Sequence, residues 1–198
     1  MQYLLFATNN SHKAEEVRSV LGKHYDIKTL KEAGIFINIP EPYDTLEKNA
    51  TEKSSVIYNL TKSDCFSEDT GLEVDALSGA PGVRSSRYAD DGLFNNNMDK
   101  LLFNLKDKEN RKAQFKTIIS LMLKGEEYKF EGVCKGIIIA NRRGQNGFGY
   151  DPVFIPEGSD KTFAEMDMEE KNIYSHRRKA VEKLMEFLEK HRQIVEKL

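Results

Sequence analysis

The sequence has few cysteines, no long apolar run and almost no net charge, and each shortage excludes a class of protein. Its two cysteines, Cys65 and Cys134, lie in separate strand-like segments without a CxxC partner. They are therefore predicted to be buried, reduced thiols rather than a disulfide or a zinc site. No apolar run approaches the ~20 residues of a membrane helix. The formal net charge of −2 provides no overall basic surface for nucleic acid.

The amino-terminal residues start directly with a strand pattern, without the basic region and apolar core of a signal peptide. We therefore expect a cytoplasmic protein. Hydrophobic residues make up 39% of the 198 residues and charged residues 31%, which suits a globular chain with a sizeable core. Internal repeats and low-complexity segments are absent. The prediction is a single bilobed domain over residues 1–198.

Hydrophobic periodicity alternates between strand and helix in the first half and changes to long strands in the second. Alternating apolar residues over 113–123 and the run 128–140 predict a long antiparallel hairpin. The sheet is therefore expected to be mixed, and the fold class α/β. The other predicted elements are strands at 3–7, 25–30, 35–39, 65–67 and 72–77, and helices beginning near residues 11, 45, 97 and 176. The apolar side of the helix that begins near residue 45 is predicted to include Leu46, Ala50, Ile57 and Leu60.

The first strand-to-helix turn has the composition of an anion-binding site. Thr8 and Asn9 end the strand, Asn10 or Ser11 can cap the helix, and Lys13 lies in its first turn. Unpaired first-turn amides and the helix dipole, about half a positive charge, favour an anion there. The GxxxxGK[ST] pattern of a Walker A loop is absent. An ordinary capped helix with a surface lysine explains this segment equally well.

Four carboxylates lie within eight residues of the chain: Glu68, Asp69, Glu73 and Asp75. Gly71, among them, is expected to form a turn between two short strands. Oxygen ligands of this kind suit a hard divalent cation. A solvated turn before a hairpin explains the segment without a metal, and for the segment taken alone it is the favoured interpretation.

Two later segments carry groups that suit a flat ring with a carbonyl oxygen. Phe148 lies between Gly147 and Gly149, where it is a poor core residue and a good stacking platform. His176 and Arg177 are predicted in the first turn of the last helix. Cations oppose the helix dipole there, a conflict expected where function overrides stability. Both side chains can donate to a carbonyl oxygen.

Together these segments would bind a nucleoside triphosphate through its phosphates, a metal and its base. Six motifs occur in order: TNNSHK (8–13), EDTGLEVDAL (68–77), GAPGVRSSRYA (79–89), GFGYDPVF (147–154), KN (171–172) and SHR (175–177). From Tyr3 to about Leu188 the sequence resembles the inosine triphosphate pyrophosphatase family, the Ham1 or RdgB type of enzyme that acts on non-standard purine nucleotides. A single motif of this kind would be a weak signal, whereas six in order are specific.

The resemblance implies an α/β fold with a mixed central sheet flanked by helices, and two lobes with an active-site cleft between them. It implies hydrolysis of dITP, ITP and XTP to the monophosphate and pyrophosphate, with Mg²⁺ as cofactor. The implied assembly is a homodimer. The implied partner is a small-molecule nucleotide, with neither nucleic acid nor membrane.

The resemblance also implies roles for individual residues. Asp69 would be the general base and, with Glu41, a metal ligand, and Glu68 is a further candidate. Lys53 would reach the phosphates, and Thr70 would lie beside the metal site and also contact phosphate. The remaining implied roles are phosphate binding by Thr8, Asn9, Asn10, Ser11, His12 and Lys13, and nucleoside binding by Phe148, Gly149, Tyr150, Asp151, Lys171, His176 and Arg177.

Some positions depart from the family pattern. Lys48 stands where the family usually has a glutamate, so no metal role is assigned to it. Glu68 and Thr70 stand where aspartate and serine are commoner, which alters their reach by about one methylene or methyl group. Arg84 replaces a frequent tyrosine, and no role is transferred to it.

The implied chemistry follows from the charges. A triphosphate carries about four negative charges, so cations and helix amides must neutralise it before a nucleophile approaches. Asp69 would orient or deprotonate the attacking water, whose pKa the metal would lower, and pyrophosphate would leave from the α-phosphorus. Donors aimed at a 6-oxo group would reject adenine, which carries an amino group there. How guanine is rejected does not follow from the sequence.

Two other functions remain open from the sequence. A Maf-like pyrophosphatase would act on other modified nucleotides, but the segments around Phe148 and His176 argue against it. The second function is a module that binds a nucleotide or nucleic acid without catalysis. The acidic segment and the near-neutral net charge argue against binding to a phosphate backbone.

Overall fold

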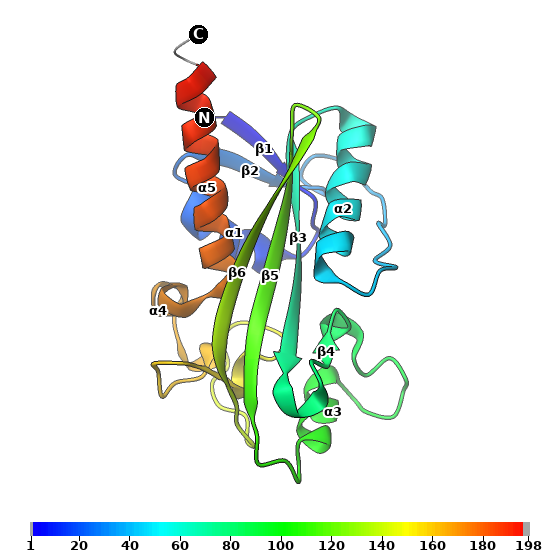
Figure 1. Ribbon diagram of the computed structural model, residues 1–198, viewed down its shortest axis with the longest axis vertical. Helices are drawn as coiled ribbons and strands as arrows, with labels where there is room; N and C mark the ends of the chain where they lie inside the picture. Colours follow the sequence, from blue (N-terminus) through cyan, green and yellow to red (C-terminus); the bar gives the residue numbers. More distant parts are fainter. Residues whose placement is uncertain (1, 196–198) are drawn as a thin grey trace. The chain divides into compact units, whose positions relative to one another are not determined.

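The protein folds as an α/β structure around one mixed sheet (Figure 1). The computed structural model describes residues 2–195. The strand order is β2-β1-β3-β5-β6-β7, and β4 pairs with β3. No helix within the described residues is long and apolar enough to span a membrane. The helices and strands are β1 (Gln2–Phe6), α1 (Ser11–Leu21), β2 (Tyr25–Thr29), α2 (Leu46–Thr61), β3 (Cys65–Val74), β4 (Pro81–Gly82), α3 (Asn97–Asn104), β5 (Lys112–Leu123), β6 (Glu126–Ile138), β7 (Phe154–Pro156), α4 (Met168–Tyr174) and α5 (His176–Val195).

The chain divides into two compact units. Unit 1 contains Met1–Asp69, Thr117–Gly132 and Arg177–Leu198, and unit 2 contains Thr70–Lys116 and Val133–His176. The strands β3, β5 and β6 each contribute residues to both units, because the boundaries fall within these strands. The prediction of a single bilobed domain stays a prediction.

In unit 1, helices cover both faces of the sheet. The pleat directs successive side chains of β1 to opposite faces. Leu4 and Phe6 pack in one apolar cluster with residues of α1 and α5. Leu5 and Ala7 pack in another cluster that includes Ile57 of α2. Figure 1 accordingly shows α1 and α5 on one side of β1 and α2 on the other. Coverage on both faces explains the continuous apolar run of this strand.

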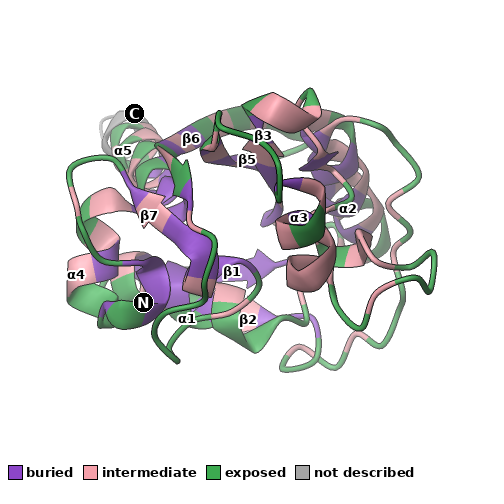
Figure 2. Ribbon diagram, turned by 90° about the horizontal axis from the view of Figure 1, so that it is seen from below, coloured by how far each residue is buried: buried purple, intermediate pink, exposed green. Residues whose placement is uncertain are grey.

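In unit 2, aromatic rings build the core. The ring of Phe115 on β5 meets Phe154 edge-on, with centroids 4.7 Å apart, and Phe163 packs against Phe154 at 5.2 Å. Residues of α3 and β3 join the same cluster. β7 pairs with β6 in antiparallel orientation and is largely buried (Figure 2). This core fixes the positions from which the glycine-rich segment 144–149 and the helix α4 begin.

The long hairpin predicted over 113–140 is confirmed. Lys124 and Gly125 join β5 and β6, and both have positive φ angles, 51° and 91°. A two-residue turn of this kind matches the twist of the flanking strands. One detail of the prediction is wrong, because residues 117–123 of β5 are all buried instead of alternating. Helices pack on both sides of this half of the strand, as they do on β1.

The acidic segment does not form the turn that the sequence suggested. Residues 65–74 are one continuous strand, β3, and a 3₁₀ turn follows at Asp75–Leu77. Gly71 is required by close approach of the backbone, since a Cβ there would lie 2.6 Å from the main-chain oxygen of Gly82. A glycine inside a strand commonly marks such an approach.

Two smaller predictions are also wrong. Residues 35–39 form no strand, and the segment that they begin stays irregular up to the start of α2. Pro40 and Pro42 lack backbone N–H groups, which disfavours sheet pairing nearby. Leu60 was expected on the buried side of α2, but it is 57% exposed. It belongs to the last turn of that helix, beyond the buried Ile57.

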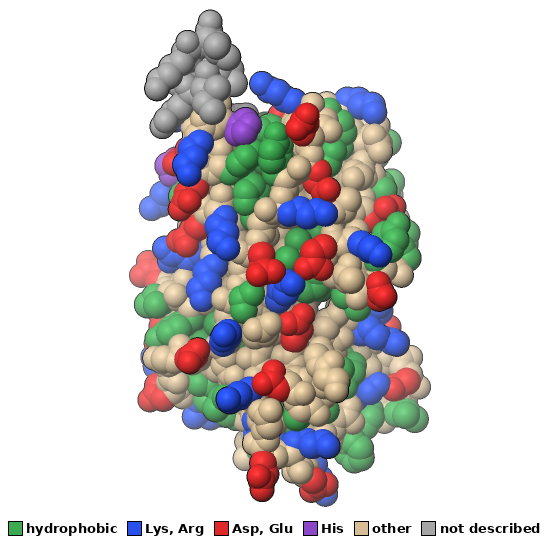
Figure 3. Space-filling view, viewed as in Figure 1, with side chains coloured by type: hydrophobic (Ala, Val, Ile, Leu, Met, Phe, Trp, Pro, Cys, Tyr) green, Lys and Arg blue, Asp and Glu red, His purple; other side chains and the backbone are tan. Residues whose placement is uncertain are grey.

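The predicted burial of the two cysteines is confirmed. The face in Figure 3 carries basic and acidic side chains intermixed, as the small net charge suggests. Cys65 and Cys134 are both buried and unbridged. Burial, together with the nearby charge of Asp64, raises the pKa of the Cys65 thiol to about 12, so it remains protonated near neutral pH.

Candidate active site

The strand β3 carries Glu68 and Asp69 into two different clusters of charged side chains. Neighbouring residues of a strand point to opposite faces of the sheet. Glu68 contacts α1 and α5, whereas Asp69 contacts α2. Thr70, the next residue, is half-buried and is the first residue of unit 2. Both clusters lie within unit 1, and we name them the Asp69 cluster (Glu41, Asn49, Lys53 and Asp69) and the Glu68 cluster (Lys13, Glu16, Glu68 and Arg177).

In the Asp69 cluster one ammonium group joins two carboxylates. Nζ of Lys53 lies 2.5 Å from Oε1 of Glu41 and 3.1 Å from Oδ1 of Asp69. Nδ2 of Asn49 donates to the main-chain oxygen of Tyr43 at 3.1 Å and lies 3.4 Å from Oδ2 of Asp69. Asn49 and Lys53 share one face of α2 because they are four residues apart. The Glu41 side chain is 26% exposed, so the cluster opens to solvent on that side.

The Asp69 cluster has more negative than positive charge. Burial raises the pKa of Asp69 above its ordinary value, and the like charge of Glu41 adds to this effect while Lys53 opposes it. Burial alone would lower the pKa of Lys53, but the two carboxylates outweigh it and raise that pKa. Lys53 therefore stays positive, and the cluster carries one surplus negative charge. Such a site is suited to a further cation.

The Glu68 cluster is a largely buried ion-pair network. Arg177 binds Glu68 in bidentate fashion, with Nε 2.7 Å from Oε2 and Nη2 3.1 Å from Oε1. Its Nη1 atom donates to Glu16, and Nζ of Lys13 lies 2.9 Å from Oε1 of Glu68. The side chains of Glu68 and Arg177 are only 1% and 2% exposed. Two acids and two bases make this cluster neutral.

Charge pairing keeps the Glu68 cluster ionised despite its burial. Burial alone would raise the pKa of Glu68, but Arg177 and Lys13 outweigh it and hold that pKa well below its ordinary value. Burial alone would lower the pKa of Arg177, but the carboxylates of Glu68 and Glu16 outweigh it and raise that pKa. The network ties α1, β3 and α5 together within unit 1.

Six of the residues predicted to bind phosphate, Thr8 to Lys13, form one turn at the start of α1. Asn10 is the N-cap, and its Oδ1 accepts from the Lys13 amide at 3.2 Å. Oδ1 of Asn9 accepts from the Lys31 amide at 3.0 Å, and Oγ1 of Thr8 accepts from the Asn10 amide at 3.2 Å. These bonds hold the turn with its helix start open to solvent. The other two predicted residues of this turn are exposed: Ser11 and His12.

In unit 2, Asp151 brings two predicted nucleoside-binding segments together. Its Oδ2 lies 2.7 Å from Nζ of Lys171 and accepts from the Phe148 amide at 2.9 Å. Nζ of Lys171 lies 5.4 Å from the centroid of the Phe148 ring, which is half-buried. Gly147 has a φ of +73°, and a Cβ there would lie 2.1 Å from Oδ2 of Asp151. Only glycine fits beside this carboxylate.

Three other residues predicted to bind the nucleoside occupy different environments. The ring of His176 is buried and stacks on Phe115, with centroids 4.6 Å apart. The Tyr150 side chain belongs to the core, and its hydroxyl donates to the main-chain oxygen of Ser85 at 2.9 Å. Burial raises the pKa of this phenol. Gly149 is exposed and has a φ of +62°.

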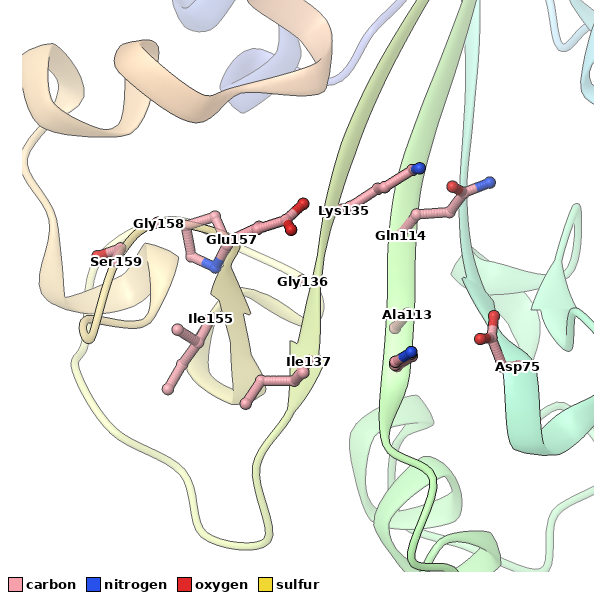
Figure 4. A pocket seen from close by; sticks show the side chains of 12 residues that line it. Asp75, Ala113, Gln114, Lys135, Gly136, Ile137, Ile155, Glu157, Gly158 and Ser159 are labelled. Atoms are coloured by element: carbon pink, nitrogen blue, oxygen red, sulfur yellow. The ribbon is translucent and has the colours of Figure 1, made fainter.

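A pocket of about 610 Å³ in unit 2 lies apart from these residues. It is lined by β5, β6, β7 and the turn that follows, and Figure 4 shows Gln114, Lys135 and Ile155 along it. Its lining includes Asp75 of the acidic segment but no residue to which the resemblance gives a role.

A Ham1 family model matches the chain over residues 4–187. The chain belongs to the Ham1 family. Curated relatives of this family include two proteins named dITP/XTP pyrophosphatase. The protein from Flavobacterium johnsoniae is 48% identical over 93% of this chain and 97% of its own length. The protein from Bacillus subtilis is 40% identical over 96% of this chain and 98% of its own length.

Solved structures agree with the family and the fold. A HAM1 protein from Coxiella burnetii is 34% identical, with a TM-score of 0.85 over 96% of this chain and all of that chain. A dITP/XTP pyrophosphatase from Mycobacterium abscessus is 37% identical, with a TM-score of 0.72 over 92% of this chain and 98% of that chain. The predicted family and the predicted α/β fold class with a mixed sheet and flanking helices are thereby confirmed.

The donor set of the Asp69 cluster fits a magnesium ion. Mg²⁺ is usually held by one or two carboxylates together with substrate phosphates, rather than by protein groups alone. Glu41 and Asp69 each direct an oxygen at the same ammonium group, so both can reach one cation. Within residues 2–195, the structure contains no group of three or more His, Cys, Asp or Glu residues that could hold a metal. A two-carboxylate site that also needs substrate oxygens agrees with both observations.

Sequence reasoning missed Glu16, which is 5% exposed and pairs with Arg177. A signal was present, because Glu16 lies between Ala14 and Val17 in the buried stripe of α1. A glutamate is almost never fully buried unless it is paired. Its partner lies 161 residues away in the chain, and the local pattern does not identify it.

Proposed function

We propose that this Ham1 protein is a Mg²⁺-dependent nucleoside triphosphate pyrophosphatase that converts dITP, ITP and XTP to the monophosphate and pyrophosphate. The observation that carries the proposal is near-full-length similarity, at 40–48% identity, to curated relatives named dITP/XTP pyrophosphatase. The Asp69 cluster and the open turn before α1 supply groups of the kind that this reaction needs. Such a reaction removes non-standard purine nucleotides from the nucleotide pool.

Within unit 1, Glu41 and Asp69 would hold the metal, and the turn from Thr8 to Lys13 would hold phosphate oxygens. A bound Mg²⁺ neutralises phosphate charge and lowers the pKa of water. The exposed start of α1 offers backbone N–H groups and the positive end of the helix dipole to an anion. Lys53 adds a mobile positive charge beside them. Phosphoryl transfer depends mainly on such positioning and charge stabilisation.

Asp69 would act as the general base for the attacking water. In the metal-free protein its pKa is raised by burial and by Glu41, while Lys53 opposes this effect. The water would attack the α-phosphorus, the bond to the bridging oxygen would break, and pyrophosphate would leave.

Within unit 2, Phe148, Asp151, Lys171 and His176 would bind the nucleoside. The half-buried Phe148 ring would stack on the base, and Lys171 would donate a hydrogen bond. The Tyr150 side chain already bonds within the core, so its contribution would come from the main chain. Arg177 remains a proposed base-binding residue. Because two carboxylates hold it, replacing it would also disturb the fold of unit 1.

The test is pyrophosphate release from dITP, XTP, dGTP, dATP and dUTP, each with and without Mg²⁺. We expect rapid release from dITP and XTP only, and only with the metal. Equal rates for dITP and dATP would contradict the base preference, and preferential release from dUTP would favour a Maf-like activity. Binding of dITP without release would indicate a non-catalytic module. The homodimer and the cytoplasmic location implied by the sequence remain predictions.

The base-binding residues are tested better by Phe148→Ala and Lys171→Met than by Arg177→Ala. Loss of a stacking contact is worth about 1–3 kcal/mol, so Phe148→Ala should raise KM for dITP at least about fivefold. The kcat value should change less, because these residues would contact the nucleoside and not the reacting phosphorus. An unchanged KM in both variants would remove the assigned nucleoside site.

A further inference from the structure

The position proposed for the metal already holds a positive charge in this structure. The Lys53 ammonium contacts one oxygen of Glu41 at 2.5 Å and one oxygen of Asp69 at 3.1 Å. These two carboxylates are the ones that would hold Mg²⁺. The Lys53 side chain is only 10% exposed, so the ammonium depends on these partners instead of on water.

A divalent cation and an ammonium group cannot share these oxygens without strong mutual repulsion. Two positive unit charges about 4 Å apart repel strongly even at an effective dielectric constant of about 20, and the repulsion doubles when one of the ions is divalent. Occupation by one therefore requires departure of the other. Asn49 remains on the second Asp69 oxygen in either case, because it is fixed by its bonds to Tyr43.

We propose that Lys53 takes the place of the metal in the nucleotide-free protein, so that the metal alone displaces it only weakly, and that it gives up the two carboxylates readily when a triphosphate brings both a metal and new acceptor oxygens. The proposal rests on the proposed function, and it specifies the substrate as the metal complex of the nucleotide. Lys53 would then move from Glu41 and Asp69 to phosphate oxygens.

The fold allows this exchange without movement of α2. The helix is held by Leu46, Ala50 and Ile57, which are buried at 4%, 0% and 0% exposure. Lysine carries its charge on a flexible four-carbon stem, so a change of rotamer is enough to redirect the ammonium. Without phosphate oxygens, release of Lys53 would leave an uncompensated positive charge at a largely buried position. The metal alone should therefore bind weakly.

The first test measures binding of Mn²⁺ alone, without nucleotide, by calorimetry and electron paramagnetic resonance. In Lys53→Met, which keeps the length of the side chain and removes its charge, we expect Mn²⁺ to bind at least about tenfold more tightly than in the wild type. Lys53→Arg, which retains a cation, should keep the weak affinity. Lys48→Met removes an exposed lysine from the same helix and is the matched control, with unchanged affinity expected.

Unchanged or weaker Mn²⁺ binding in Lys53→Met would overturn the proposal. Circular dichroism and thermal unfolding establish that the variant is folded. If it is not, the wild type gives the answer after reductive ¹³C-methylation, with the Lys53 signal assigned by its loss in Lys53→Arg. Saturating Mg²⁺ should shift this signal and leave that of Lys48 in place, and a Lys53 signal unmoved while Mg²⁺ binds would again overturn the proposal.

These measurements separate the proposal from the proposed function. Metal binding is measured without nucleotide or turnover, so tighter binding in Lys53→Met would stand even if dITP were not hydrolysed. Hydrolysis of dITP by the wild type, combined with equal Mn²⁺ affinities of wild type and Lys53→Met, would leave the function intact and remove the exchange.

Discussion

The Glu68 cluster and the Asp69 cluster start from neighbouring residues of β3 and differ in charge balance and access. The first pairs two acids with two bases, and its Glu68 and Arg177 side chains are almost fully buried. The second sets one lysine against two acids, and its Glu41 side chain is 26% exposed. The first cluster is neutral and almost fully buried apart from its Lys13 side chain, which is 19% exposed, while the second is partly open and carries surplus negative charge.

This difference separates a stabilising role from a chemical one. In the neutral cluster, removal of any member leaves a buried charge without its partner, so the network resists change. In the acidic cluster, ionisation of Asp69 is disfavoured by its surroundings, which is typical of groups that bind ligands or transfer protons. Under the proposed function, adjacent carboxylates in one strand would therefore have different roles, set by the charges on opposite faces of the sheet.

The largest expected effect comes from Asp69→Asn. Loss of a general base typically lowers the rate by about 10²–10⁴-fold, so pyrophosphate release from dITP should fall about 10³-fold. The melting temperature should stay the same or rise, because the variant removes a surplus buried charge. Steady-state kinetics and calorimetry measure the two quantities.

Glu73→Gln is the matched control for this prediction. Glu73 lies on the same strand and accepts a hydrogen bond from Gln114 at 2.7 Å, apart from both clusters. Its activity should remain within about twofold, as expected for a residue outside the site. Asp69→Asn with near-normal turnover would remove the distinction between the clusters.

The second effect concerns stability and comes from Glu68→Gln. In this variant Glu16 is the one remaining acid of the cluster, while Arg177 and Lys13 are both positive. One positive charge in the buried cluster is then uncompensated. Breaking a buried ion pair in this way costs about 3–5 kcal/mol. Urea unfolding at neutral pH should show this loss, whereas Glu73→Gln should lose less than about 1 kcal/mol. If Glu68→Gln had normal stability and lost as much activity as Asp69→Asn, the stabilising role assigned to Glu68 would be wrong.

The family, the mixed sheet and most elements could be predicted because they depend on local patterns. The strand at residues 3–7, the helix after Asn10 and the hairpin around Gly125 follow from apolar periodicity and turn composition. The six motifs identified the segments that carry Asp69 and Lys171. What a motif could not indicate is which side of the sheet each residue faces.

Partners that are distant in the chain explain what the sequence did not show. Gly71 was interpreted as a turn because its close neighbour Gly82 is on another segment. Arg177 was predicted as a base donor, while its pairing with Glu16 and Glu68 spans more than 100 residues of sequence. The proposed exchange of Lys53 also depends on the meeting of Glu41 and Asp69 at one ammonium group. Each of these contacts requires the tertiary fold.

The third prediction concerns the pH dependence of the Glu68 cluster. The folded-state pKa of Glu68 is lowered from its ordinary value of 4.5. For such a group the stabilisation is complete above pH 4.5 and is lost as pH falls toward the folded-state pKa. The difference in unfolding free energy between wild type and Glu68→Gln should therefore be constant between pH 5.5 and 7 and shrink below pH 4.5. A difference that grows on acidification would contradict the ion-pair assignment.

The smallest effect is the opposite pH signature of the Asp69 cluster. The folded-state pKa of Asp69 is raised from 3.8, so protonation favours the folded state and stability from this group falls as pH rises above 3.8. Activity has the reverse dependence, because the base must be ionised to accept a proton. The value of kcat/KM for dITP should therefore show an acid limb that depends on Asp69. This limb should be absent from the residual activity of Asp69→Asn and present in Glu73→Gln. An acid limb that persists unchanged in Asp69→Asn would assign the proton acceptor to another group.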